Sequence, residues 1–222
     1  MSKNHFVGLD CGASKILSQK ASFNLDLDLV IPFGNSIEVL YSNNKDWIEN
    51  FSPVPVQAQL KQFLKNSIIL TSEEISQGKV IIEEIKKLLD FTGQNNSSIC
   101  FPGLKSNEGI CVMANGPRMP EYLNYIESKI NQSVYPLESD ANMCIWGEEY
   151  ALNGSLRNIN NAYYLGGGTG TADGLKLKSK LIPFDQISSW MAKTIEMKTN
   201  NGESLENYTS MSGVNKLINR LT

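Results

Sequence analysis

The sequence has little of the material from which zinc sites and membrane spans are built. Its 222 residues include one histidine, His5, and four widely separated cysteines without a C-x-x-C pair. Because zinc is held by clustered cysteine and histidine ligands, this pattern argues against a zinc site. No apolar run approaches the length needed to cross a bilayer, and "MSKNHFVGLD" lacks a long apolar signal region.

Net charge is also small. The chain has 20 Lys and Arg against 23 Asp and Glu, a formal net charge of -3, and no basic block. Nothing in this distribution supports a nucleic-acid or anionic-membrane partner. Separated cysteines are compatible with reduced thiols. We therefore expect a cytoplasmic protein with no nucleic-acid and no membrane partner.

The chain can nevertheless bury a sizeable core. With 222 residues and 41% hydrophobic content, it is long enough for one large or two small domains. "HFVGLD" and "ILSQKASF" predict two strands joined by a tight turn at "CGASK". The alternating stretch "LDLDLVIPFGNSIEVLYSN" predicts further strands, joined by a loop where Pro32 and Gly34 interrupt it.

Helical spacing first appears after these strands. "SEEISQGKVIIEEIKKLLDFTG" predicts a helix that ends at Gly93, with Gly78 as a candidate break. "SSICFPGL" and "GICVMANGP" predict two strands, and "MPEYLNYIESKI" a helix with Pro120 in its first turn. A strand "SVYPLESD", a helix "ANMCIWGEEYAL" and a second hairpin within "AYYLGGGTGTADGLKLKSKLI" follow. This order indicates α/β architecture.

Two turns of small residues are candidate phosphate sites. Glycine and small hydroxyl residues expose backbone N–H groups that can wrap a phosphate, and "DCGASK" and "GGGTGT" both qualify. Neither has Rossmann or Walker spacing, and strands follow both turns where those motifs require helices. The simpler interpretation is that each is only a hairpin turn. An acidic stretch between them, "ESDANMCIWGE", favours the functional interpretation.

Together these segments resemble the ROK family (repressor, open reading frame, kinase). "GLDCGASK", the Pro-Gly pair at Pro102, "ESDANMCIWGE", "LGGGTGTADG" and "LENYTSMSG" have the order and spacing of that family over almost the whole chain. The resemblance implies the actin-like ATPase (ribonuclease H-like) fold, an α/β fold with two related halves around a cleft. We expect residues 1–137 to form the first half and residues 138–222 the second.

The resemblance also implies roles for individual residues. Asp140 would be the general base that accepts a proton from a sugar hydroxyl as it attacks the γ-phosphate of ATP. Asp10 would hold Mg²⁺, directly or through water. The implied phosphate contacts are Asp10, Gly12, Ser14, Lys15, Gly168, Thr169 and Gly170. The implied substrate contacts are Asn115, Gly116, Glu138 and Asn142. ATP and Mg²⁺ are the expected cofactors, without zinc, and a homodimer is compatible with this assignment.

Plainer interpretations remain for several of these residues. Asp140 could be only a helix cap, and Asn115-Gly116 only a turn. Aromatic residues in strands and helices are more often core than ligand contacts, so packing is the expected role of four of them. These are Trp146, Tyr163, Tyr164 and Trp190.

The sequence departs from the family pattern after the second turn. Family kinases carry a G-E-x-G-H segment that contacts the sugar, whereas this chain reads "SSWMAKTIEMKTNNGESLE", in which Glu196 or Glu203 could substitute. The chain also stops soon after "LENYTSMSG", so we expect a shortened C-terminal half. Two functional hypotheses follow. One is a sugar kinase for a hexose or N-acetylhexosamine, with weak turnover, and the other is a non-catalytic sugar- or nucleotide-binding regulatory relative.

Overall fold

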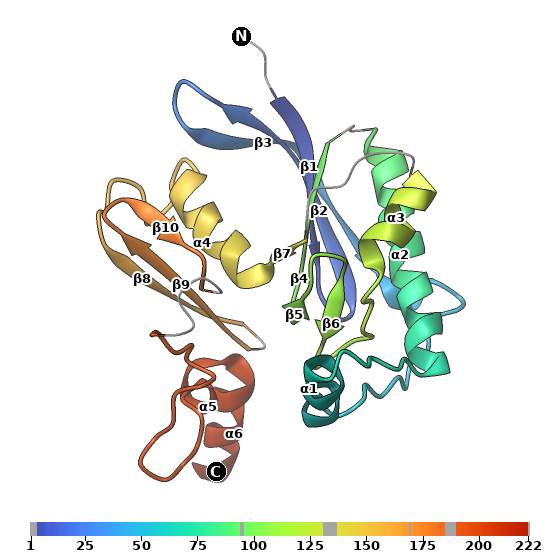
Figure 1. The fold of residues 1–222 in the computed structure, drawn as a ribbon. Helices are drawn as coiled ribbons and strands as arrows, with labels where there is room; N and C mark the ends of the chain where they lie inside the picture. Colours follow the sequence, from blue (N-terminus) through green and yellow to red (C-terminus); the bar gives the residue numbers. More distant parts are fainter. Residues whose placement is uncertain (1–3, 94–95, 131–136, 169, 185–189, 222) are drawn as a thin grey trace. The chain divides into compact units, whose positions relative to one another are not determined.

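The chain folds into two compact units, Met1–Ser139 and Asp140–Thr222. The computed structural model describes residues 4–93, 96–130, 137–168, 170–184 and 190–221 (Figure 1). Both units combine helices with strands, which confirms the α/β class. The functional division after residue 137 remains a prediction.

The first unit is organised around a five-stranded mixed sheet. Its strand order is β3-β2-β1-β4-β7. The strands are β1 (Asn4–Cys11), β2 (Lys15–Asn24), β3 (Leu29–Leu40), β4 (Ser97–Phe101) and β7 (Glu138–Ser139). β1, β2 and β3 run antiparallel, whereas β4 and β7 continue parallel to β1. The predicted opening hairpin is thus confirmed.

The expected loop at Pro32 and Gly34 is wrong, because β3 is one continuous strand of 12 residues. Proline cannot donate to a ladder, but β3 is the outermost strand of the described sheet, where a missing N–H is tolerated. Gly34 has a positive φ of 68°, and the β2–β3 register shifts between Ser18 and Lys20. A bulge therefore absorbs the irregularity that the sequence suggested would end the strand.

Two helices cover one side of this sheet (Figure 1). α2 (Ser72–Thr92) begins with a capping box between Thr71 and Glu74 and ends at Gly93 in the left-handed region, as predicted. It runs unbroken through Gly78, where an added Cβ would lie 3.1 Å from Cγ of Met119. Packing against Met119 therefore explains this glycine better than a helix break does. α3 (Tyr122–Ile130) starts two residues after Pro120, so Pro120 precedes the helix instead of lying in its first turn.

Several short elements of the first unit were not predicted. They are η1 (Tyr41–Asn43), α1 (Val56–Leu64) and β5 (Leu104–Lys105). β5 pairs with β6 (Ile110–Val112) in a small hairpin, and β6 confirms the strand predicted within "GICVMANGP". The core joins β1 and β4 to α2 and α3. Its fully buried members include Val7, Cys11, Ile16, Tyr41, Ile81, Ile85, Ile99, Phe101 and Ile126.

The second unit contains the antiparallel sheet β10-β9-β8. Its strands are β8 (Ala162–Gly167), β9 (Thr171–Leu177) and β10 (Lys180–Ile182), and α4 (Asp140–Tyr150) packs on β9. An added Cβ on Gly174 would lie 2.6 Å from Cδ1 of Ile145, so the helix sits close to the strand. Buried Lys176 donates to Oε2 of Glu149 at 2.5 Å and to the Leu156 carbonyl at 2.8 Å. Two unpredicted helices, α5 (Glu206–Thr209) and α6 (Met211–Leu221), end the described chain.

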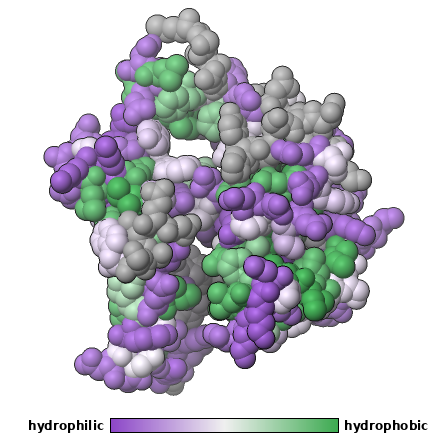
Figure 2. Space-filling view, viewed as in Figure 1, coloured by the Kyte–Doolittle hydropathy of each residue, from purple (hydrophilic) through white to green (hydrophobic). Residues whose placement is uncertain are grey.

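The described surface mixes polar and apolar side chains. Figure 2 shows hydrophilic and hydrophobic residues interspersed on the face that it displays. Within the described ranges, every helix is too short or too polar to cross a membrane.

Candidate functional site

The first glycine turn is a tight hairpin between β1 and β2. The Gly12 N–H donates to the Lys15 carbonyl at 2.9 Å, and the Ser14 carbonyl accepts the N–H of buried Tyr41 at 3.0 Å. Lys15 itself is exposed and pairs with Glu38 at 2.5 Å. The Gly12 N–H is therefore used by the turn, while the side chains of Ser14 and Lys15 lie at the surface.

Three strands bring two acidic residues to one edge of the sheet. Asp10 in β1 is in register with Cys100 in β4, and Cys100 is in register with Glu138 in β7. Residues in register on neighbouring strands project from the same face. Since neighbouring strands are about 4.8 Å apart, the backbones of Asp10 and Glu138 are roughly 10 Å apart. The structure thus brings together two predicted residues that are far apart in the sequence.

Asp10 is the exposed end of this row. Its Oδ1 accepts the Cys100 thiol at 3.4 Å. The next residue, Cys11, is buried in the core. Burial raises the pKa of the Cys11 thiol, and neighbouring Cys100 and Asp10 raise it further, so this thiol stays protonated. The acidic end of β1 is therefore chemically distinct from the neutral core directly behind it.

Asp140 follows β7 immediately and is the first residue of α4. Its side chain is exposed, and Oδ1 accepts the Ala141 N–H at 2.9 Å. The carboxylate therefore helps to satisfy the helix start, as the capping interpretation predicted. Glu138 and Asn142, two residues before and after it, are half-buried, and both have polar partners.

The second glycine turn lies between β8 and β9. The Gly168 N–H donates to the Gly170 carbonyl at 2.9 Å, so it too is used by its own turn. Thr169, a predicted phosphate contact, lies outside the described residues. An added Cβ on Gly168 would lie 3.7 Å from the nearest atom, which is ordinary contact.

The segment that contains α5 and the start of α6 holds this second turn. The Thr171 N–H donates to Oε1 of Glu206 at 3.0 Å, and the hydroxyls of Thr171 and Thr209 are 2.7 Å apart. The Met211 N–H donates to the Gly168 carbonyl at 2.8 Å. Sequence reasoning identified "LENYTSMSG" as part of the resemblance but missed Glu206. An acidic residue at the start of that motif was the available signal.

Asn115 and Gly116 lie in the loop after β6, in the first unit. Asn115 is exposed at the tip of the loop, whereas Gly116 is buried. An added Cβ on Gly116 would lie 2.6 Å from Cε of Met113, so the loop folds tightly over that side chain. The predicted turn at this dipeptide is therefore present, and its amide side chain is accessible.

The two proposed substitutes for the family's sugar-contacting glutamate have partners within the second unit. Oε2 of Glu196 accepts the Lys193 N–H at 2.8 Å. Glu203 accepts the Tyr208 hydroxyl at 2.6 Å and lies 3.7 Å from Nη1 of Arg220. All three contacts lie within the chain between residues 193 and 220.

The packing role expected for the aromatic residues holds only in part. Trp190 is 64% exposed, so the packing interpretation is wrong for this residue. Tyr163 packs edge-on against Phe184 and donates to Asp173 at 2.5 Å. Partial burial, together with the Asp173 carboxylate, raises the pKa of Tyr163 to about 12.

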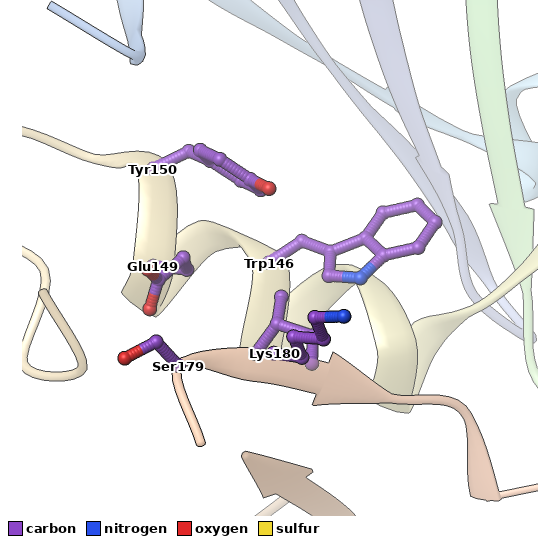
Figure 3. A pocket seen from close by; sticks show the side chains of 6 residues that line it. Trp146, Glu149, Tyr150, Ser179 and Lys180 are labelled. Carbon is purple, nitrogen blue, oxygen red and sulfur yellow. The ribbon is translucent and has the colours of Figure 1, made fainter. Parts of the chain in front are cut away.

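A shallow pocket of about 580 Å³ lies in the second unit (Figure 3). Trp146 and Tyr150 project from α4 on one side, and Lys180 and Ser179 lie on the other. Trp146 is half-buried here and lines the pocket. The six lining residues include none of the predicted site residues.

No family model matches the chain, and no curated protein matches it by sequence. Solved structures do match. A Cytophaga hutchinsonii protein assigned as a sugar kinase has a TM-score of 0.64 at 16% identity, over 98% of this chain and 62% of that one. The inorganic polyphosphate/ATP-glucomannokinase from Arthrobacter sp. strain KM has a TM-score of 0.60 at 13% identity, over 96% of this chain and 70% of that one.

The ROK hexokinase from Thermus thermophilus has a TM-score of 0.56 at 15% identity, over 98% of this chain and 64% of that one. This chain therefore spans 62% to 70% of the length of these three proteins. At such identities the likeness shows the fold alone. The chain has an α/β fold with a mixed sheet that matches the sugar kinases of the ROK type.

Proposed function

We propose that the protein is an ATP-dependent sugar kinase that transfers the γ-phosphoryl group of Mg-ATP to a hydroxyl of a hexose or N-acetylhexosamine. The observation that carries the proposal is the acidic edge, where Asp10 and Glu138 share one row and Asp140 follows. In open α/β sheets, ligands bind outside the carboxyl ends of the strands. This edge is such a position, because β1, β4 and β7 are parallel.

Asp10 is suited to hold Mg²⁺, directly or through water. It is an exposed carboxylate at the end of a parallel strand, and oxygen ligands are what this hard cation prefers. The ion would neutralise charge on the transferred phosphoryl group. The Cys100 thiol, a weak donor, contacts one oxygen of Asp10 at 3.4 Å and so helps to orient the carboxylate.

In this proposal both glycine turns contact the nucleotide phosphates. Gly12, Ser14 and Lys15 act from the first turn, and Gly168, Thr169 and Gly170 from the second. Since the N–H groups of Gly12 and Gly168 already bond within their own turns, their contribution is close approach of the backbone. Lys15 would exchange Glu38 for phosphate, and exposed ion pairs of this kind cost little to open.

Asp140 is the proposed general base. Its exposed carboxylate would accept the proton of the attacking sugar hydroxyl. Glu138 and Asn142 would orient either Asp140 or the sugar, and Asn115 with Gly116 would contact the sugar from the loop after β6. The sugar and the nucleotide would meet in a cleft between two related halves. The protein would act in the cytoplasm, and a homodimer would be compatible with this role.

The test is sugar-stimulated ADP release by the purified chain with Mg-ATP. Glucose, mannose, N-acetylglucosamine and N-acetylmannosamine form the substrate panel. Asp140→Asn serves as the site variant, and Asp46→Asn, another exposed aspartate, as the matched control. We expect release with at least one sugar, its loss in Asp140→Asn and its retention in Asp46→Asn.

Two outcomes would sink the kinase proposal. One is ADP release that every sugar leaves unchanged, and the other is equal turnover by wild type and Asp140→Asn. Saturable binding of Mg-ADP and a sugar without turnover would instead favour the non-catalytic relative. A thermal-shift series with the same ligands measures that binding, because ligands of the native state raise its apparent stability.

A further inference from the structure

The loop after β6, which carries Asn115, is held at both ends by buried polar side chains. We propose that Gln59 and Arg118 are positioning residues that fix this loop for contact with the substrate. The inference rests on the proposed function, in which Asn115 contacts the sugar. It adds two residues and a role for α1, a helix that the sequence analysis did not predict.

Gln59 holds the start of the loop. This residue of α1 is 0% exposed, and its side-chain amide forms hydrogen bonds with both backbone groups of Met113. Oε1 accepts the Met113 N–H at 2.8 Å, and Nε2 donates to the Met113 carbonyl at 2.9 Å. Nε2 also donates to the Val54 carbonyl at 2.6 Å. One side chain therefore occupies both backbone groups of the residue that leads into the loop.

Arg118 holds the end of the loop. Its guanidinium is 0% exposed and makes a forked contact with Glu74, in which Nε and Nη2 each lie 2.7 Å from a carboxylate oxygen. Nη1 donates to Oε1 of Gln62 at 2.6 Å, and Nη2 donates to the Ile69 carbonyl at 2.9 Å. The end of the loop is thus fixed simultaneously to α1 and to the start of α2.

The electrostatics of this clamp favour positioning over stability. Burial alone would raise the pKa of Glu74, but hydrogen bonds from Arg118 and the Thr71 backbone outweigh it and lower the pKa. Both charges are therefore retained in the interior. Because apolar residues of similar volume are often as stabilising as a buried ion pair, such a pair is better explained by the geometry that it imposes. A forked guanidinium–carboxylate contact fixes direction as well as distance.

The contacts of Gln59 and Arg118 are the two braces of the loop. Between them, only a short tip of the loop is exposed. Ala114 and Asn115 face solvent, while Gly116, Pro117 and Arg118 are buried. Gly116 lies directly against the side chain of Met113, the same residue that Gln59 holds. Because the tip has little freedom of its own, the two braces set where the Asn115 amide lies. A misplaced tip would weaken sugar binding without disturbing either glycine turn.

Gln77 provides a matched control. It is also 0% exposed, and its amide brackets Ile48 in the same way, accepting that N–H at 3.0 Å and donating to that carbonyl at 3.2 Å. The experiment compares Gln59→Leu with Gln77→Leu, since each substitution removes a side-chain amide that is 0% exposed. Gln59→Glu is a second, milder variant that keeps an acceptor for the Met113 N–H.

Three quantities are measured on the full chain: calorimetric affinity for the four-sugar panel, affinity for Mg-ADP, and amide hydrogen exchange at residues 114–116 and 118. We expect Gln59→Leu to weaken sugar binding by about tenfold, the equivalent of one typical hydrogen bond. The Mg-ADP affinity of Gln59→Leu should stay within about twofold of the wild-type value. The sugar affinity of Gln59→Glu should lie between those of wild type and Gln59→Leu. Gln77→Leu should leave sugar affinity unchanged. Equal sugar affinity in Gln59→Leu and wild type, or an equal loss in Gln77→Leu, would overturn the inference.

Failure of the proposed function looks different. Wild type that binds none of the sugars would refute the sugar assignment, and hydrogen exchange then decides the positioning role. Faster exchange at residues 114–116 and 118 in Gln59→Leu, but not in Gln77→Leu, supports the positioning role whatever the ligand. Unchanged exchange there would refute it.

Discussion

Replacing Arg118 with methionine should destabilise the first unit strongly. The methionine fills similar space but removes four hydrogen bonds, two to Glu74, one to Gln62 and one to the Ile69 carbonyl. Glu74 is 1% exposed and would keep only its bond from the Thr71 N–H. The variant therefore leaves a buried carboxylate without its counter-ion.

The expected cost follows from that unpaired charge. Removing one partner of a buried pair typically destabilises a protein by about 3–5 kcal/mol, whereas replacing both partners can be close to neutral. We therefore predict a loss of about 4 kcal/mol for Arg118→Met. Arg118→Met combined with Glu74→Gln should recover most of it, because the oxygen of a neutral amide can still accept the Thr71 N–H.

Urea unfolding followed by tryptophan fluorescence measures this loss. Trp47 belongs to the first unit and stacks on Tyr41 at 5.1 Å between ring centroids. Trp146 and Trp190 belong to the second unit, so a Trp146→Phe/Trp190→Phe background makes the signal specific to the first unit. A loss below about 1 kcal/mol for Arg118→Met, or a double variant as unstable as the single one, would refute the reasoning.

Three further predictions use the same chain. Gly168→Val should weaken Mg-ADP binding. Gly147→Val is the control, because it lies in the same unit and nothing lies within 4 Å of its added Cβ, and it should leave Mg-ADP binding unchanged. Equal Mg-ADP affinity in the two folded variants would remove the second turn from the site. Asp140→Asn should lower sugar phosphorylation by roughly a hundredfold or more at nearly unchanged unfolding free energy, and a large stability loss with unchanged turnover would leave capping as its only role. The pKa of Glu74 is lowered below 4.5 in the folded state, so its stabilisation should be present above that pH and lost as pH falls through the folded pKa. Between pH 7 and pH 3, urea midpoints should then fall further in wild type than in the Arg118→Met/Glu74→Gln variant, and a constant difference between the two would contradict this.

Local signals were sufficient for the helices and hairpins that carry their own boundaries. α2 was predicted from the helical spacing of its apolar residues and from Gly93, which ends it in the left-handed region. The course of β3 was not predictable, because proline is tolerated only where the strand has no further neighbour. That condition is set by the sheet, and no local pattern around Pro32 contains it.

α1 shows why some helices give only a weak signal in the sequence. Its fully buried residue is Gln59, a polar side chain at the position where a periodic pattern requires an apolar one. The amide is satisfied by Val54 and Met113, and Met113 lies 54 positions away. Apolar periodicity could not identify a helix whose inward face makes hydrogen bonds to a distant loop.

The candidate site was predictable in its residues more than in its contacts. The order of the motifs singled out Asp10, Glu138 and Asp140, but the register that aligns Asp10 with Glu138 passes through Cys100, which carried no signal. Glu206 is 35 positions from the Thr171 N–H that it accepts. Such pairings depend on tertiary packing, which spacing within a motif does not report.

Strand β1 explains how one element can serve the core and the proposed chemistry together. Val7, Leu9 and Cys11 alternate along it and are all buried against the helices on one side. The same two-residue alternation directs Asp10 to the opposite face, where it is exposed and in register with Cys100. The core therefore makes no use of the Asp10 carboxylate, and almost any polar residue would serve folding at that position. An acid there, aligned through Cys100 with Glu138, is better explained by the ligand that it would hold.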